Sequence, residues 1–161
     1  MQPEILKPAA WPRPSGYSNG IAVAGRQIFV AGQIGWNAQG RFTSSRLADQ
    51  VRQALQNIRA VLAEAKAGPE HVVRLTWYLT SREEYLADLG NIGAAYRDVM
   101  GKTFPVMSVV QVVALMEPDA KVEIEATAVV PDTITTATAS VEPVVEVFDI
   151  ALDDIVAPPS R

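Results

Sequence analysis

Apolar and polar residues alternate with the period of a β-strand near the end of the well-patterned part of this chain. Segment 121–130 places small apolar residues against carboxylates and a hydroxyl: Val122, Ile124, Ala126 and Ala128 against Glu123, Glu125 and Thr127. This period predicts a strand with one buried face and one carboxylate-bearing face. Segment 105–116 is apolar on both alternating faces, which is typical of a strand buried on both sides. The short connection through Pro118 and Asp119 then predicts that the two strands form a hairpin.

Two other regions of the chain show strand patterns. Residues 21–24 and 27–33 are β-rich runs separated by Gly25-Arg26, a turn signal, and they predict an opening hairpin that ends at residues 37–40. Residues 72–80 are rich in β-branched and aromatic side chains, which favours a further strand.

Helical spacing occupies the two intervals between these strands. From Leu47 to Ala65 apolar residues recur every three or four positions, and Gly68 can end the helix. A second helix is expected to begin after Ser81, with Glu84 completing a capping box, and to run to Gly101. The order ββαβαββ predicts an α+β fold in which two helices pack on one face of a mixed sheet. The opposite face of so apolar a sheet then needs a partner.

Several motifs in this order resemble the RidA/YjgF family of small trimeric proteins. They are SGYSNGIAVAGRQIFVAGQIG at 15–35, the helix QALQNIRAVLAEAKAG, the strand VVRLTWYLT, the helix NIGAAYRDVMG, and FPVMSVVQVVALMEPDAKVEIEATAVV at 104–130. The resemblance covers roughly residues 15–131. It implies a chorismate-mutase-like fold in which three sheets close into a central barrel, as a homotrimer with ligand clefts between subunits.

The pattern divides the chain into a RidA/YjgF-like domain, residues 1–131, and a C-terminal extension, residues 132–161. The extension contains a Thr/Ala-rich run followed by the apolar segment VEPVVEVFDIAL. Its composition permits disorder, yet its apolar residues suffice to dock on a surface. We expect a linker followed by an arm docked on the same or a neighbouring subunit.

The resemblance also implies a chemistry for the cleft. Family members hydrolyse imines to a ketoacid and ammonia without a cofactor, because an imine carbon is already electrophilic and mainly requires a placed water and proton transfer. Glu123 matches the acid that positions the water, and Tyr17 matches a cleft tyrosine. Gly32 matches a glycine whose backbone faces the ligand. Each residue also has a structural interpretation: a barrel-lining carboxylate, an interface aromatic and a β-bulge glycine.

Met107 stands where the family usually carries the arginine that binds the substrate carboxylate. Methionine cannot supply a charged hydrogen bond, although its flexible thioether suits apolar ligands. Met107, Val109, Trp36 and Tyr17 are therefore expected to form a cleft for a larger or less charged ligand, with Gln111 as a polar contact; core packing and a surface tryptophan are the alternatives. Candidates for a replacement cation are Arg74, Arg97 and, nearest along the chain, Lys102.

Two functions remain open at this point. The chain is expected to be a hydrolytic deaminase of a reactive enamine or imine other than the usual small 2-imino acids, and the presence of Glu123 favours this function. Alternatively it is a non-catalytic trimer that binds a small molecule or serves a pathway partner. Met107 favours this alternative, as does Ala31, which stands where serine is frequent in the family.

Composition narrows the remaining possibilities. The net charge of −4 and the scattered basic residues argue against nucleic acid as a partner, although older family names include endoribonuclease. The absence of cysteine excludes thiolate nucleophiles and Cys-ligated metals, and the single histidine, His71, is expected to be a polar strand-start residue. No run approaches the ~20 apolar residues of a membrane span, and the N-terminus lacks the pattern of a secretory signal, so a cytoplasmic location is expected.

Overall fold

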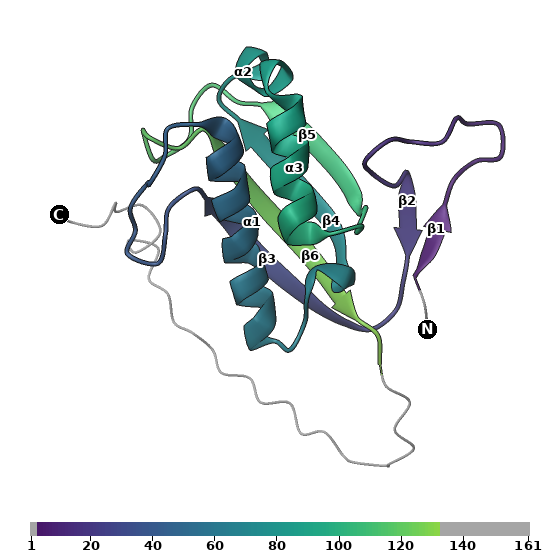
Figure 1. Cartoon of the computed structure of the whole chain (residues 1–161). Coiled ribbons are helices and arrows are strands. Elements are labelled where there is room, and N and C mark those ends of the chain that lie inside the picture. The colour runs from purple at the N-terminus through teal and green to yellow at the C-terminus, as the bar shows by residue number, and fades with distance from the viewer. Residues whose placement is uncertain (1–2, 133–161) are drawn as a thin grey trace.

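The computed structural model describes residues 3–132 of the chain (Figure 1). The strands are β1 (Glu4–Leu6), β2 (Gly20–Ala22), β3 (Arg26–Ile34), β4 (Val72–Leu79), β5 (Val106–Gln111) and β6 (Val122–Val130). The helices are α1 (Leu47–Glu64), the 3-10 turn η1 (Pro69–His71), α2 (Arg82–Ala87) and α3 (Leu89–Met100). The predicted α+β class is confirmed. The extension beyond residue 132 lies outside the described residues.

The main sheet has the strand order β3-β6-β4-β5. Strand β6 runs antiparallel to both of its neighbours, whereas β4 and β5 are parallel, so the sheet is mixed as predicted. Helix α1 connects β3 to β4, and α2 with α3 connects β4 to β5, which is how parallel strands are usually joined. Figure 1 shows α1 and α3 side by side on one face of this sheet. No described helix covers the opposite face, which we call the open face (Figure 1).

Both predicted hairpins are wrong. Strand β2 pairs with β1, a strand that the sequence pattern did not indicate, and this small sheet lies beside the main body (Figure 1). The two long C-terminal strands are separated by β4, because β6 inserts between β3 and β4. The physical reason is burial: the alternating apolar side chains of β6, Val122, Ile124, Ala126 and Ala128, are all buried, which requires a central position under the helices.

The segment predicted as a strand buried on both faces is instead an edge strand followed by a loop. Strand β5 ends at Gln111, and its residues are only half-buried or exposed. Val113 and Met116, which follow in the loop to β6, are 104% and 92% exposed. Within the described part of one chain, the exposed apolar residues of this segment, Val110, Val113 and Met116, therefore have no cover.

The second predicted helix is divided into α2 and α3 at Asp88, whose backbone (φ −126°, ψ 26°) leaves the helical region. The predicted cap is present, since Ser81 Oγ accepts a hydrogen bond from Glu84 N at 3.1 Å. The other half of the capping box is wrong, because the Glu84 carboxylate binds Lys121 Nζ at 2.6 Å instead. Lys121 offers a full charge, which competes well with a neutral backbone donor.

The hydrophobic core lies between the helices and the sheet. Helix α1 contributes a fully buried stripe of Val51, Leu55, Ile58 and Leu62, as its apolar spacing predicted. The stripe packs with α3 against the buried side chains of β4 and β6, among them Leu75, Trp77, Val122 and Ile124. Successive side chains of a strand point to opposite faces of the sheet, so the residues between these buried positions, including Glu123, face away from the helices.

Candidate functional site

Glu123 and Gly32 meet on the open face. The register of β3 against β6 shifts between Val30 and Gln33, which makes a β-bulge of Ala31 and Gly32. The Glu123 side chain lies over Gly32 so closely that a Cβ added there would come within 2.7 Å of Glu123 Cδ. Both bulge residues are exposed to solvent. A carboxylate therefore lies beside backbone that the bulge has removed from the regular ladder.

Charged and hydroxyl groups from β4 and β6 continue this face. Tyr78 donates a hydrogen bond to Glu125 Oε1 at 3.3 Å. Desolvation first, and then the negative charge of Glu125, raise the pKa of Tyr78 above its ordinary value. Thr76, Arg74 and Glu125 line a hollow of about 500 Å³ together with Phe29, which is 73% exposed. The open face thus combines acids and phenol with an uncovered aromatic ring.

Met107 and Val109 point to the other side of the sheet. Both pack against the hydrophobic core between sheet and helices, as does Tyr85 of α2. Gln111, on the same side of β5, accepts a hydrogen bond from Arg82 N at 3.1 Å. Val109 and Gln111 line a small hollow of about 170 Å³ with Tyr85 and Arg82. Arg74 is exposed and lies on the open face, away from Met107.

Tyr17 lies beside the start of the strand that carries Met107. Ser18 forms a parallel bridge with Val106, and its backbone N donates to Pro105 O at 3.0 Å. The Ser18 hydroxyl adds a bond of 2.6 Å to Phe104 O. Tyr17 itself is 43% exposed and lines a hollow of about 870 Å³ that also contains Lys102. Lys102, considered from the sequence as a replacement cation, therefore shares a hollow with Tyr17.

Trp36 occupies a third location, in the loop after β3. Its ring lies 6.5 Å from that of Phe42, and the two residues form an isolated antiparallel bridge. Asn57 of α1 holds this loop by donating to Ile34 O at 3.1 Å and to Trp36 O at 2.9 Å. Trp36 lines a hollow against α1, and neither Met107 nor Tyr17 lines it.

Apart from Trp36, the sequence-predicted site residues consequently form two groups within one chain. Glu123 and Gly32 lie on the open face toward the β3 edge, whereas Met107, Val109 and Gln111 lie on the helix-covered face at the β5 edge. Tyr17 flanks the second group. The described part of one chain does not bring the two groups into a single pocket.

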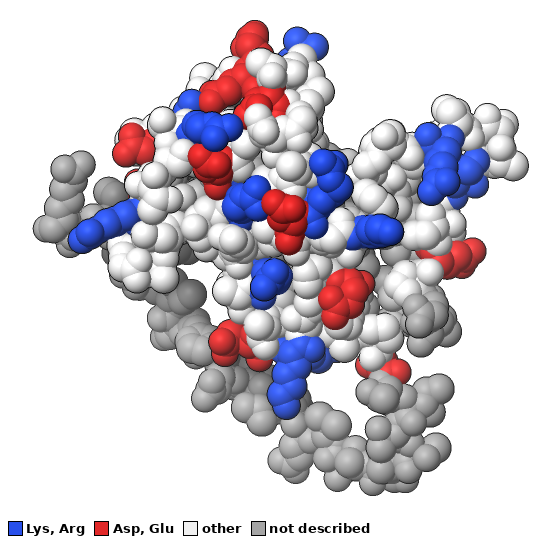
Figure 2. Space-filling view, in the orientation of Figure 1, with Lys and Arg blue, Asp and Glu red and all other residues white. Residues whose placement is uncertain are grey.

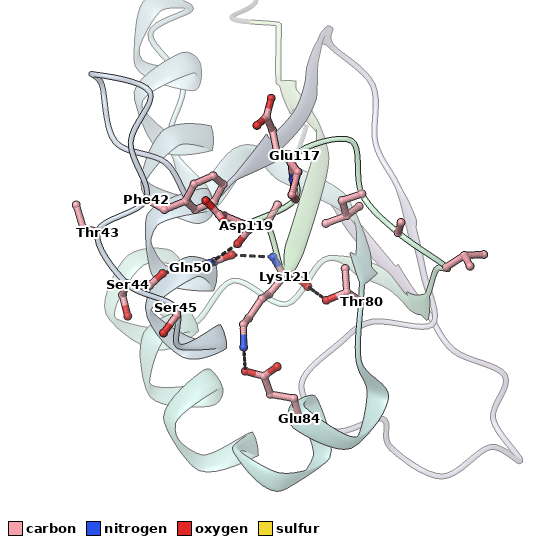
Figure 3. A pocket seen from close by; sticks show the side chains of 15 residues that line it. Phe42, Thr43, Ser44, Ser45, Gln50, Thr80, Glu84, Glu117, Asp119 and Lys121 are labelled. Atoms are coloured by element: carbon pink, nitrogen blue, oxygen red, sulfur yellow. Dashed lines mark hydrogen bonds and ion pairs between the residues drawn. The ribbon is translucent and has the colours of Figure 1, made fainter. Parts of the chain in front are cut away.

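Sequence reasoning missed a polar hollow of about 700 Å³ at the start of β6 (Figure 3). There Gln50 is buried; its Nε2 donates to Ser44 O at 3.1 Å and to Asp119 O at 2.9 Å, and its Oε1 accepts from Lys121 N at 2.8 Å. Figure 3 shows the Lys121 side chain pointing toward Glu84, which neutralises it. These bonds fix the chain two residues before Glu123. A glutamine within a helical pattern gave no signal of this role.

The surface and composition of the described residues carry few other signs of a site. Figure 2 shows acidic and basic side chains interspersed over the helices rather than a continuous basic groove. Residues 3–132 contain no group of three or more His, Cys, Asp or Glu placed to hold a metal ion. None of the helices within this range is long and apolar enough to cross a membrane.

Comparison with known proteins decides the family. A family model described as Endoribonuclease L-PSP matches residues 9–130. The chain belongs to this family, the RidA/YjgF family. A RutC family protein of Pyrococcus abyssi is 34% identical over 130 residues, which cover 80% of this chain and 98% of that protein. A bovine 2-iminobutanoate/2-iminopropanoate deaminase is 30% identical over 127 residues, covering 78% of this chain and 89% of the relative.

Solved structures of RidA/YjgF proteins share the fold. A Rid family protein of unknown function from Yersinia pestis superposes with a TM-score of 0.68 at 35% identity, covering 81% of this chain and all of the other. The YjgF protein of Escherichia coli gives a TM-score of 0.56 at 31% identity, covering 70% of this chain and 87% of the other. The family resemblance found in the sequence motifs is thus confirmed.

Proposed function

We propose that this protein is a RidA-type hydrolytic deaminase of a reactive enamine or imine metabolite. The observation that supports it most is the placement of the Glu123 carboxylate directly over the exposed Gly32 bulge. Relatives named 2-iminobutanoate/2-iminopropanoate deaminase and reactive intermediate deaminase add to the support. The reaction would convert C=N and water to C=O and ammonia.

In this proposal Glu123 acts as the general base. It accepts a proton from a water molecule as the water oxygen attacks the imine carbon, and it passes this proton to the imine nitrogen, which gives a carbinolamine. It then takes the proton of the carbinolamine hydroxyl and delivers it to the same nitrogen as the C–N bond breaks. The bulge at Gly32 brings main chain close to the substrate, since no Cβ intervenes. Ammonia leaves with the C–N electron pair, and the carbonyl forms. The reaction requires no oxidant and no cofactor.

We further propose that a complete site forms only between copies of the chain, in a homotrimer. The two groups of site residues lie at opposite edges and on opposite faces of the sheet, so a second copy can supply the missing group. The open face carries the exposed Phe29, and the β5–β6 loop exposes Val113 and Met116, which are apolar surfaces that association would cover. Light scattering on the full chain should give three times the monomer mass; a monomer would overturn this assembly.

The substrate is proposed to differ from the usual small 2-imino acids. Met107 offers neither charge nor hydrogen bond to a carboxylate, and a lost charged hydrogen bond costs about 1.5–3 kcal/mol, a factor of ten to a hundred in affinity. Restoring the cation by Met107→Arg should increase turnover of 2-iminopropanoate. No increase, in a variant that still folds and assembles, would count against this reading of Met107.

A second candidate is a trimer that binds a small molecule or a pathway partner without turnover. Met107 and Ala31 favour it, because both lack polar groups that the family usually places at the ligand. The test measures ketoacid release from freshly generated 2-iminopropanoate and from a bulkier aromatic imine, against spontaneous hydrolysis. An enzyme loses turnover in Glu123→Gln while it retains ligand affinity; the wild type of a binding protein accelerates neither imine.

A further inference from the structure

The hollow beside Tyr17 is strongly basic for a chain of net charge −4. Lys7, Arg13 and Lys102 line its volume of about 870 Å³, and within the described residues no Asp or Glu does. Figure 2 shows basic side chains over the loop end of the lobe formed by β1 and β2, and an acidic side chain at its strand end. Three cations without a lining acid produce a local positive potential, which attracts anions.

Two of the three cations are free to bind a ligand. The Lys7 ammonium is already hydrogen-bonded to the main chain, because its Nζ donates to Pro8 O at 3.0 Å and to Trp11 O at 2.8 Å. Arg13 and Lys102 take part in none of the ion pairs formed within residues 3–132. Their positive charges are therefore uncompensated in the described part of the chain.

The backbone that carries Lys102 is fixed on both sides. Gly101 has a φ of +65°, a conformation that favours glycine and turns the chain sharply after α3. Tyr96 then donates its hydroxyl to Thr103 O at 2.7 Å. On the far side of the turn, Ser18 binds Phe104 O and so holds the Tyr17 segment against it. Tyr17 and Lys102 are thus held in one hollow by bonds from three separate segments.

The remaining lining matches a ligand with an apolar body. Phe104 and Ile5 line the hollow and are 46% and 58% exposed, so uncovered apolar surface lies beside the cations. Asn19 adds a polar residue to the lining.

We propose that this hollow binds the carboxylate of an organic anion with an apolar or aromatic body, and that Lys102 and Arg13 supply the charge that Met107 lacks. The inference rests on the proposed function, whose substrate it describes as a bulkier anionic imine. The parallel bridge of Ser18 with Val106 sets the hollow beside the residue that precedes Met107. In this proposal Lys102 and Arg13 contact the substrate carboxylate from beside the start of β5, in place of a cation at position 107.

The test compares two probes of nearly equal shape, phenylacetate and its neutral amide phenylacetamide. Affinities are measured by calorimetry on the full chain at low ionic strength, where exposed charges are least screened. Lys102→Gln removes one charged contact, so it should weaken the affinity for phenylacetate about tenfold and leave the affinity for phenylacetamide unchanged. Lys102→Arg should restore most of the loss. Lys66→Gln, an equal loss of charge on an exposed residue outside the hollow, is the matched control.

The outcomes separate this site from the proposed function. If phenylacetate binding depends on Lys102 but the protein hydrolyses no imine, the proposed anion site is supported and the proposed deaminase function is overturned. Imine turnover with a KM that is unchanged in Lys102→Gln and in Arg13→Gln retains the deaminase and overturns the site. Failure of wild-type protein to prefer phenylacetate over phenylacetamide overturns the site as well.

Discussion

Substitution of Gly32 by alanine tests the arrangement of the open face most sharply. A Cβ at this position would come within 2.7 Å of Glu123 Cδ and 2.8 Å of Glu123 Cγ, closer than real Cβ atoms approach other heavy atoms. The nearest obstacles belong to one flexible side chain rather than to backbone. The φ of Gly32 lies outside the range that favours glycine, so alanine fits the main chain.

The expected magnitudes follow from what must move. The Glu123 carboxylate can swing away into solvent, so the free energy of unfolding should change by less than about 1 kcal/mol. The position that we propose for that carboxylate in catalysis is lost, and misplacement of a reacting group by about 1 Å can cost a hundredfold in rate. Gly32→Ala should therefore reduce imine hydrolysis about ten- to a hundredfold in a protein of nearly normal stability.

The assay combines urea denaturation with turnover of whichever imine the wild type hydrolyses best. Gly90→Ala is the matched control, because its Cβ would meet nothing within 4 Å. A double variant adds a second check: once Glu123→Gln has removed the base, Gly32→Ala should cost little further activity. Full activity in Gly32→Ala, or equal losses in the presence and absence of Glu123, would refute the reasoning.

Three further variants test buried contacts that support the two groups of site residues. Gln50→Met should lose about 3 kcal/mol of unfolding free energy in urea titrations, since three backbone groups lose their bonds to the buried Gln50 side chain; the exposed Gln56→Met should be nearly neutral, and equal effects would contradict the bracing role. Gly35→Ala should lose about 1–3 kcal/mol, because the added Cβ meets Gln50 Cα of α1 at 2.8 Å and the helix must shift; unchanged stability would mean that helix and strand are not in close contact. Burial raises the pKa of Tyr96 far above its ordinary value of 10.0. The unfolded chain therefore ionises first, and stability is lost as pH rises above about 10; Tyr96→Phe should flatten this decline in thermal melts, and an identical decline would contradict the assignment.

The elements of the fold could be predicted from local pattern, whereas the strand order could not. Helix α1 and strand β6 follow from spacing alone, because each buries a continuous face. The hairpin between β5 and β6 was wrong because neighbouring strands in sequence usually pair, and only the burial of β6 reveals that β4 intervenes. A strand as short as β1, three exposed residues long, leaves no periodic signal.

The candidate site was predictable where one motif carries it. Glu123 and Gly32 were predicted as site residues from their positions in the family motifs, and the structure adds that the Glu123 carboxylate lies over the Gly32 bulge. The basic hollow was not predictable, because Arg13 and Lys102 are far apart in sequence and meet only through tertiary folding. Gln50 was missed for a similar reason, since its backbone partners lie in two loops.

The central claim, a site completed between copies, is tested most directly by mixing two variants that we expect to be inactive, one altered at Glu123 and the other at Tyr17 in the second group of site residues. Glu123→Gln and Tyr17→Ala are each purified, unfolded, mixed in equal amounts and refolded together. In a randomly mixed trimer about a quarter of the sites would combine an intact Glu123 from one copy with an intact Tyr17 from another, and about a quarter of the wild-type activity should return. Activity no higher than the average of the two parent variants would contradict the account.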